Sequence, residues 1–126
     1  MNKQQILESL KSENIDKSEV IIISGASLVL QGIIDNTSDI DMACTDKYYH
    51  SLSWATQIGG CGKEIKHKDN FDISNNLYYP ECIEMVCGYR VMNIEKCLEI
   101  KKMLNRDKDK NVIKVLENYL KEKKNG

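Results

Sequence analysis

The stretch from Ile21 to Cys44 reads Ile-Ile-Ile-Ser-Gly-Ala-Ser-Leu-Val-Leu-Gln-Gly-Ile-Ile-Asp-Asn-Thr-Ser-Asp-Ile-Asp-Met-Ala-Cys, and its order of residue types decides the fold. The run Val20–Ile23 is apolar and β-branched, which is typical of a buried strand. The turn Ser24-Gly25 ends this strand, and the apolar residues within Ala26–Ile33 suit a short helix. The stretch therefore predicts a strand, a turn, a short helix and a second strand that ends near Cys44.

The turn Ser24-Gly25 directly precedes the predicted helix. The first amide N–H groups of a helix are unpaired and lie at the positive end of its dipole, so a glycine there lets a phosphate approach closely. A second interpretation is that the two residues only turn the chain and cap the helix. The pattern by itself leaves both interpretations open.

Two aspartates follow in the segment Ser38-Asp39-Ile40-Asp41-Met42-Ala43. Because side chains alternate along a strand, Asp39 and Asp41 share one face. Aspartate is depleted in strands, and neighbouring carboxylates repel each other unless water, a cation or a base shares their face. Magnesium prefers such oxygen ligands and binds one or two carboxylates together with substrate phosphates. A solvated strand end is the alternative, but the upstream turn favours a metal site.

These residues resemble the nucleotidyltransferase superfamily of the DNA polymerase beta type, in particular its small stand-alone members. The family signature is a hydrophobic residue, Gly, Gly or Ser, a spacer, and then Asp-hydrophobic-Asp or Glu. It maps onto Ile23-Ser24-Gly25, the spacer Ala26–Ser38 and the triplet Asp39-Ile40-Asp41. The usual first glycine is Ser24 in this chain, and serine still offers its amide and a hydroxyl.

The resemblance implies a third carboxylate on a later strand, beside the first two. The candidates are Asp69, Asp72 and Glu84. Asp72 is preferred because Phe71-Asp72-Ile73 is a hydrophobic-acid-hydrophobic triplet that follows the strand-like segment Glu64–His67. Glu84, within Cys82–Val86, is the alternative.

A second region of resemblance lies downstream. Gly88–Asn93 suits a strand, and Ile94–Asn105 suits a helix that precedes a basic segment. In several minimal family members such a helix carries a lysine and is followed by an arginine and a Lys-Asp pair, which here are Lys101, Arg106, Lys108 and Asp109. The family usually has a further Asp near the position of Val112, which this chain lacks.

The resemblance also assigns roles to these residues. Ser24 and Gly25 are expected to hold the phosphates of a nucleotide, with Ser27 and Lys101 as weaker contributors. Arg106 and Asp109 are expected to join the last two helices. Ordinary solvated surface charges are the alternative for the downstream set, because charge runs usually face water.

The implied activity is metal-dependent nucleotidyl transfer. Asp39, Asp41 and Asp72 would bind two magnesium ions, with a nucleoside triphosphate as the donor and a hydroxyl of a small molecule, a protein or an RNA end as the acceptor. A partner chain or a homodimer is expected to complete the acceptor pocket. The competing hypothesis is a catalytically degenerate binding or regulatory module with the same fold, and a third is one component of a toxin–antitoxin pair.

Length and composition are those of a single domain. The chain has 126 residues and a formal net charge of −1, with no basic tract interleaved with aromatic residues. We expect one domain over 1–126, with a sheet core in 1–93 and C-terminal helices in 94–122. We expect no strong nucleic-acid binding. The five cysteines show no Cys-x-x-Cys pair, and no apolar stretch is long enough for a membrane span, which predicts a cytoplasmic protein with free thiols.

The predicted fold class is α/β (α+β), with a small mixed, mostly antiparallel sheet flanked by helices and a C-terminal helical hairpin. Further elements are a helix over Asn2–Ser12, two to four short strands within Lys63–Val91, and a helix over Thr45–Gln57 closed by the glycines that follow. The inward residues of that last helix are expected to be Tyr48, Leu52 and either Trp54 or Ala55.

Two further features are the loop Ser74–Glu81 and the C-terminal helix. The loop carries Tyr78 and Tyr79, which either stack a base or an acceptor, or pack. The C-terminal helix has an apolar stripe that is expected to pack the hairpin on the sheet, made of Val112, Val115, Leu116, Tyr119 and Leu120.

Overall fold

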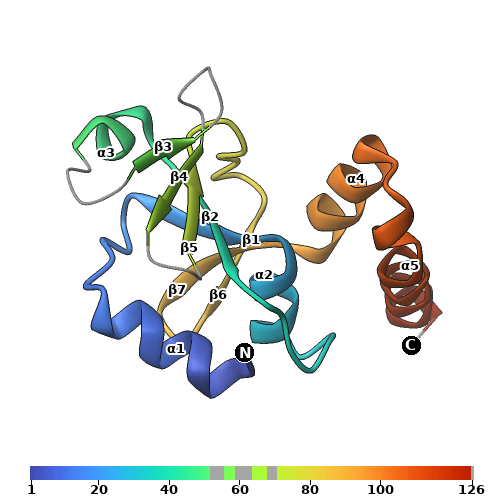
Figure 1. The fold of residues 1–126 in the computed structure, drawn as a ribbon. Helices are drawn as coiled ribbons and strands as arrows, with labels where there is room; N and C mark the ends of the chain where they lie inside the picture. The colour runs from blue at the N-terminus through green and yellow to red at the C-terminus, as the bar shows by residue number, and fades with distance from the viewer. Residues whose placement is uncertain (52–55, 59–63, 68–70, 126) are drawn as a thin grey trace.

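The computed structural model describes residues 1–51, 56–58, 64–67 and 71–125. Its centre is a mixed sheet of seven strands, in the order β3-β4-β5-β2-β1-β7-β6 (Figure 1). The strands are β1 Val20–Ile23, β2 Ile40–Cys44, β3 Thr56–Ile58, β4 Glu64–His67, β5 Phe71–Ser74, β6 Ile83–Val86 and β7 Tyr89–Met92. The helices are α1 Lys3–Ser12, α2 Ser24–Leu30, α3 Asp46–Ser51, α4 Ile94–Leu104 and α5 Lys110–Asn125, with a 3-10 turn over Asp107–Asp109.

Antiparallel pairing dominates the sheet, as predicted. The pairs β1–β2, β3–β4, β4–β5 and β6–β7 are antiparallel, whereas β1–β7 and β2–β5 are parallel. The strands β1 and β2 lie inside the sheet, between β5 and β7. They are antiparallel neighbours because α2 and the following loop return the chain alongside β1. The mixed, mostly antiparallel sheet flanked by helices confirms the predicted fold class.

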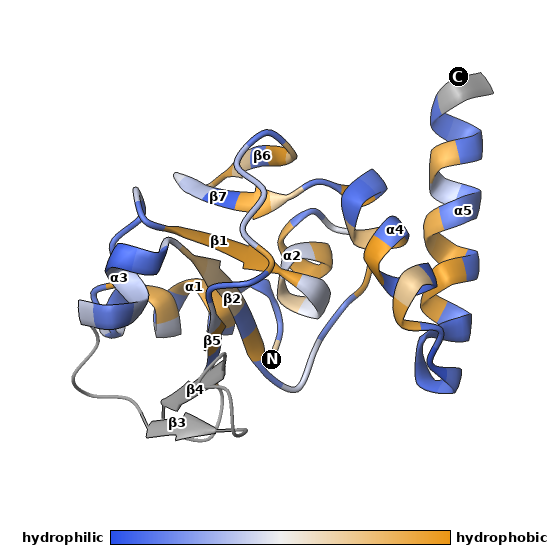
Figure 2. Ribbon diagram, turned by 90° about the horizontal axis from the view of Figure 1, so that it is seen from above, coloured by the Kyte–Doolittle hydropathy of each residue, from blue (hydrophilic) through white to orange (hydrophobic). Residues whose placement is uncertain are grey.

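Both faces of β1 are buried, which explains why all four of its residues are apolar. Val20 and Ile22 face a cluster that contains the buried residues of α1, Ile6 and Leu10. Ile21 and Ile23 belong to the cluster on the other face, with the buried residues of α4: Ile94, Cys97 and Ile100. Helices therefore cover the sheet from both sides (Figures 1 and 2).

The helical ends follow local capping rules. The side chain of Asn2 accepts a hydrogen bond from the amide of Gln5 and starts α1, and Asn93 caps α4 through the amide of Lys96. Asn105 ends α4 in the left-handed conformation, with φ of 50°. The predicted ends of these two helices therefore agree with the structure to within one residue.

The C-terminal hairpin packs on the sheet mainly through α4, whose buried residues join the cluster on one face of β1. In both views α5 stands apart from the strands and lies beside α4 (Figures 1 and 2). Of the predicted stripe, Leu116 is fully buried, whereas Val115 is 43% exposed and Tyr119 36% exposed. The stripe is therefore only partly covered, because α4 alone is too narrow to cover it.

The predicted helix over Thr45–Gln57 is wrong at its C-terminal end. The helix α3 covers Asp46–Ser51, with the hydroxyl of Thr45 accepting from the amide of Tyr48, but Thr56–Ile58 is the strand β3. The reason is tertiary, because β3 pairs with β4, six residues farther along the chain. Tyr49 is the buried residue of α3 and Tyr48 is half-buried, while Leu52, Trp54, Ala55 and the glycines at 59, 60 and 62 lie outside the described residues.

The short helix α2 begins two residues earlier than predicted and ends at Leu30. Its first residue, Ser24, has φ of +57°, so the chain turns into the helix at the serine itself.

None of the helices in the described part of the chain combines the length and apolarity that a membrane span requires.

Candidate active site

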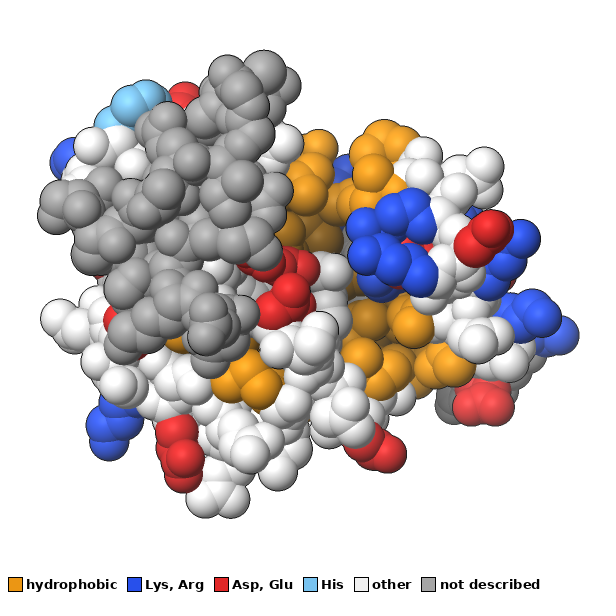
Figure 3. Space-filling model, in the orientation of Figure 1, with side chains coloured by type: hydrophobic (Ala, Val, Ile, Leu, Met, Phe, Trp, Pro, Cys, Tyr) orange, Lys and Arg blue, Asp and Glu red, His pale blue; other side chains and the backbone are white. Residues whose placement is uncertain are grey.

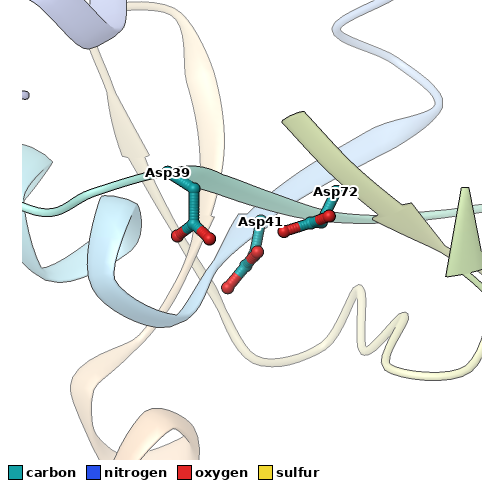
Figure 4. Close-up of side chains that lie close together, drawn as sticks. All are labelled: Asp39, Asp41 and Asp72. Carbon is teal, nitrogen blue, oxygen red and sulfur yellow. The ribbon is translucent and has the colours of Figure 1, made fainter. Parts of the chain in front are cut away.

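Three aspartates converge at one edge of β2 and β5. Asp41 and Asp72 are direct partners across the parallel β2–β5 pair, so their side chains leave the same face of the sheet. Asp39 precedes Asp41 by two positions and points the same way (Figure 4). One carboxylate oxygen from each residue lies within 4.8 Å of the others, and all three residues are half-buried. The structure thus brings together the three predicted carboxylates.

This cluster of Asp39, Asp41 and Asp72, here called the acidic triad, could hold a metal ion. Three carboxylates at this separation repel one another, and a divalent cation offsets that repulsion. The oxygen-only donor set suits a hard cation such as magnesium or calcium and disfavours soft metals.

Of the three candidates for the third carboxylate, Asp72 is the one that lies beside Asp39 and Asp41. Glu84 lies exposed on the edge strand β6, separated from β2 by β1 and β7. Asp69 lies outside the described residues. The alternation along β5 explains the placement, because Phe71 and Ile73 are buried and thereby turn Asp72 to the open face.

A cavity of about 300 Å³ lies against the triad. Asp41 and Asp72 line it from the sheet, and Lys101 and Arg106 line it from α4 and the segment that follows. Hydrophobic side chains complete its wall, namely Leu77, Ile100 and Leu104 among others. Figure 3 shows acidic side chains near the middle of this face, with hydrophobic and basic side chains beside them. The cavity therefore combines an acidic side, a side lined by Lys101 and Arg106, and an apolar wall.

The basic side of the cavity is held by a buried aspartate. Lys101 Nζ lies 3.3 Å from Asp109 Oδ1, and Arg106 Nε donates to Asp109 Oδ2 at 2.6 Å. Lys101 and Asp109 are both buried, whereas the side chain of Arg106 is 40% exposed. Burial acts to raise the pKa of Asp109, but the hydrogen bond from Arg106 and the charge of Lys101 outweigh it, so its pKa is lowered. Asp109 joins α4 to the turn before α5, as expected for the junction.

Ser24 lines the cavity from the start of α2. Its φ of +57° lies in the left-handed region, which costs a residue with a Cβ about 1 kcal/mol or more relative to glycine. This position is therefore one where the backbone favours glycine and the chain carries serine instead.

Gly25 and Ser27 are not among the residues that line the cavity. The open side of Gly25 faces Thr37, because a Cβ placed there would lie 2.5 Å from Thr37 Oγ1. Ser27 is fully buried, donates to the carbonyl of Met92 at 2.6 Å and accepts from Gln31 Nε2 at 2.9 Å. The hydroxyl of Ser27 is thus used inside the core.

The loop between β5 and β6 contributes to the cavity, although not through its tyrosines. Tyr78 receives a hydrogen bond from Arg90 at 2.8 Å, and the ammonium of Lys96 lies 4.1 Å from the ring centre of Tyr79. Both rings pack against the hydrophobic cluster around α4, which agrees with the packing alternative. Leu77 lines the cavity instead. The sequence analysis did not identify Leu77. Its one signal was its position, directly after the polar pair Asn75-Asn76 and directly before Tyr78-Tyr79.

The thiols near the site are poor nucleophiles. Cys97 lines the cavity, and burial raises its pKa against the opposing effect of the hydrogen bond with Ser27. Burial also raises the pKa of Cys44, to about 12. Because the thiolate is the reactive form, these residues act as small apolar groups at neutral pH. The chemistry of the cavity therefore belongs to its carboxylates and cations.

Comparisons with protein-family models, with curated proteins and with solved structures found no match to this chain. The fold and the site define an α+β domain whose central sheet presents an acidic triad beside a partly basic cavity.

Proposed function

We propose that this protein is a metal-dependent nucleotidyltransferase, which moves a nucleoside monophosphate from a nucleoside triphosphate to a hydroxyl acceptor. The observation that carries the proposal is the convergence of Asp39, Asp41 and Asp72 within 4.8 Å beside a cavity that also contains Lys101 and Arg106. A phosphoryl donor needs both a cation to hold its oxygens and positive side chains to neutralise its charge. The motif that spaces Ser24-Gly25 from Asp39-Ile40-Asp41 supports the same class.

The acidic triad would hold two magnesium ions. When bound, they supply charge stabilisation for the triphosphate and lower the pKa of the acceptor hydroxyl. The acceptor oxygen forms a bond to the α-phosphorus, the bond from that phosphorus to the bridging oxygen breaks, and pyrophosphate leaves with the electron pair. Asp72, which lies on β5 beside β2, would lie nearest the acceptor and take its proton.

The remaining residues would bind and orient the donor. Lys101 and Arg106 line the cavity, and together with Asp109 they carry one net positive charge, which suits the phosphates of the donor. Ser24 offers its hydroxyl and amide at the same cavity. The apolar wall, which includes Ile100 and Leu104, suits the flat face of a base.

The test is calorimetric binding of each of the four ribonucleoside triphosphates, with and without magnesium. The native chain is compared with Asp39→Asn/Asp41→Asn, and Glu84→Gln serves as a matched control because Glu84 is exposed on the edge strand β6, which β1 and β7 separate from β2. We expect magnesium-dependent binding of at least one nucleotide by the native chain and the control, and its loss in the double variant. Binding that persists without the two carboxylates, or no binding by the native chain, contradicts the proposal.

A non-catalytic nucleotide-binding module is the second candidate, and one observation favours it. Ser24 stands at the first glycine position of the motif although its φ of +57° favours glycine, and Val112 stands where the family usually has Asp, so the chain departs from the motif at two positions. Pyrophosphate release separates the two candidates, because only a transferase releases it from a bound triphosphate. Nucleotide binding without any pyrophosphate release in the presence of small hydroxyl acceptors and RNA ends would favour the module.

A further inference from the structure

Asp39 is the member of the triad that the sheet itself does not hold. Asp41 lies within β2, and Asp72 lies opposite it in the parallel ladder, so backbone hydrogen bonds set both positions. Asp39 lies one residue before β2 begins. Its position therefore depends on what holds the loop between α2 and β2, which covers residues 31–39.

Thr37, two residues before Asp39, is the anchored point of this loop. Its amide donates to the carbonyl of Met1 at 3.0 Å, and its carbonyl accepts from the nitrogen of Met1. The backbone of Thr37 is thus tied to the segment that leads into α1. The tie is independent of the β2 ladder.

The side chain of Thr37 is seated on the other side against Gly25. A Cβ placed on Gly25 would lie 2.5 Å from Thr37 Oγ1, which is closer than side chains tolerate, and 3.2 Å from Thr37 Cβ, which is a tight contact. Gly25 lies within α2, and the described glycines with positive φ are Gly32 and Gly88, so the backbone at Gly25 does not require glycine. The contact with Thr37 is what excludes a larger residue at this position.

We infer that Thr37 is a positioning residue, and that its seat on Gly25 holds the Asp39 carboxylate in register with Asp41 and Asp72. Ser24, which lines the cavity, is the direct neighbour of Gly25, so the same contact ties the start of α2 to the loop that carries Asp39. In this arrangement the glycine of the motif leaves room for the side chain of Thr37 next to the start of α2. The inference rests on the proposed function, because its consequence is the metal affinity of the triad.

The experiment measures Mn²⁺ affinity by electron paramagnetic resonance, with Mn²⁺ alone as the probe and at a temperature where every variant is folded by circular dichroism. The variants are Gly25→Ala, Thr37→Ala, Thr37→Ser and the double variant Gly25→Ala/Thr37→Ala. We expect Gly25→Ala to weaken Mn²⁺ binding about tenfold, in the range known for residues that orient metal ligands. We expect the double variant to recover to within about threefold of the native chain, because alanine at 37 removes the closest contact.

Gly88→Ala is the matched control for a general loss of stability. Gly88 has φ of +83° in the turn between β6 and β7, so alanine there strains the backbone at a distance from the triad. We expect it to lower the melting temperature and to leave Mn²⁺ affinity unchanged. A merely structural role for Gly25 would make the two glycine variants behave alike.

Each outcome separates this inference from the proposed function. If the native chain binds Mn²⁺ and Gly25→Ala binds it equally well, the positioning role is wrong and the metal site stands. The same conclusion follows if the double variant is as weak as Gly25→Ala. If Gly25→Ala does not fold, the pair at 37 decides, because Thr37→Ala should weaken binding about threefold while Thr37→Ser keeps it. A native chain that binds no Mn²⁺ overturns the metal site, and the positioning role with it.

Discussion

Replacing Asp109 by asparagine is expected to destabilise the fold by about 3 kcal/mol, because the substitution leaves the buried ammonium of Lys101 without its counter-charge. The two groups are 3.3 Å apart, which corresponds to a gross attraction of roughly 5 kcal/mol at an effective dielectric constant of 20. Arg106 adds about 1 kcal/mol or less, because its side chain is 40% exposed and regains water. Asparagine keeps an oxygen for the Arg106 hydrogen bond, so the loss falls mainly on Lys101.

The native chain, Asp109→Asn, Lys101→Met and the double variant are compared in two assays. Urea denaturation gives the unfolding free energy, and heating gives the melting temperature. For a domain of this size, about 3 kcal/mol corresponds to a fall of roughly 12 °C in melting temperature. The double variant should be more stable than the sum of the single effects predicts, with a coupling of about 2 kcal/mol, because it removes both charges. An Asp109→Asn variant that melts within about 2 °C of the native chain, or strictly additive effects, would refute the reasoning.

The pH dependence of the same variant gives an independent check. The pKa of Asp109 is lowered in the folded state, so its stabilising effect is fully present above the unfolded value of about 3.9 and is lost as the pH falls through the folded pKa. The difference in unfolding free energy between the native chain and Asp109→Asn should therefore be constant near neutral pH and shrink below about pH 4. A difference that stays the same down to pH 2 would contradict the assignment of the effect to the charge.

Three further predictions concern the triad, the turn before α2 and the thiols. Added magnesium should raise the melting temperature of the native chain in calorimetry and leave that of Asp41→Asn nearly unchanged, because the variant removes one of the three carboxylates that lie within 4.8 Å of one another; an equal rise in both proteins would contradict the assignment of Asp41 to the metal site. Ser24→Gly should raise the unfolding free energy by about 1 kcal/mol in denaturant titrations, since φ of +57° favours glycine; a loss of stability would show that the serine side chain contributes more than the strain costs. Alkylation at pH 8, mapped by mass spectrometry, should modify the exposed Cys87 and spare the buried Cys44 and Cys97 in the folded protein. Rapid labelling of either buried thiol would contradict their burial.

Part of the candidate site could be predicted because its signals are local. The pair Asp39 and Asp41 shares a face because side chains alternate along any strand, whatever its neighbours. Val20–Ile23 is an apolar β-branched run, and it forms β1 with those bounds. Asp72 between Phe71 and Ile73 also carries a local signal, since burial of its neighbours turns it to the open face.

Other assignments failed or stayed open because their causes are long-range. Ser27 looks like a hydroxyl near a helix start, yet it is fully buried and hydrogen-bonded to the carbonyl of Met92, 65 positions away. Gly25 suggests a phosphate cradle, yet the position that a Cβ of Gly25 would take lies against the side chain of Thr37, which is on the following loop. The end of the helix predicted over Thr45–Gln57 failed for a nearer reason, because Thr56–Ile58 pairs in a hairpin with β4, six residues farther along the chain.

Local sequence patterns sufficed for the central strands, for the helices over Asn2–Ser12 and Ile94–Asn105, and for the shared face of Asp39 and Asp41. Each of these follows from residues within a few positions of one another, where propensity, capping and alternation act. Only the tertiary structure decided that Asp72 stands opposite Asp41 and that Lys101 meets Asp109 at the far wall of the cavity. Strand register and helix packing are set by contacts between distant segments, and a single sequence does not carry the partners of those contacts in its local pattern.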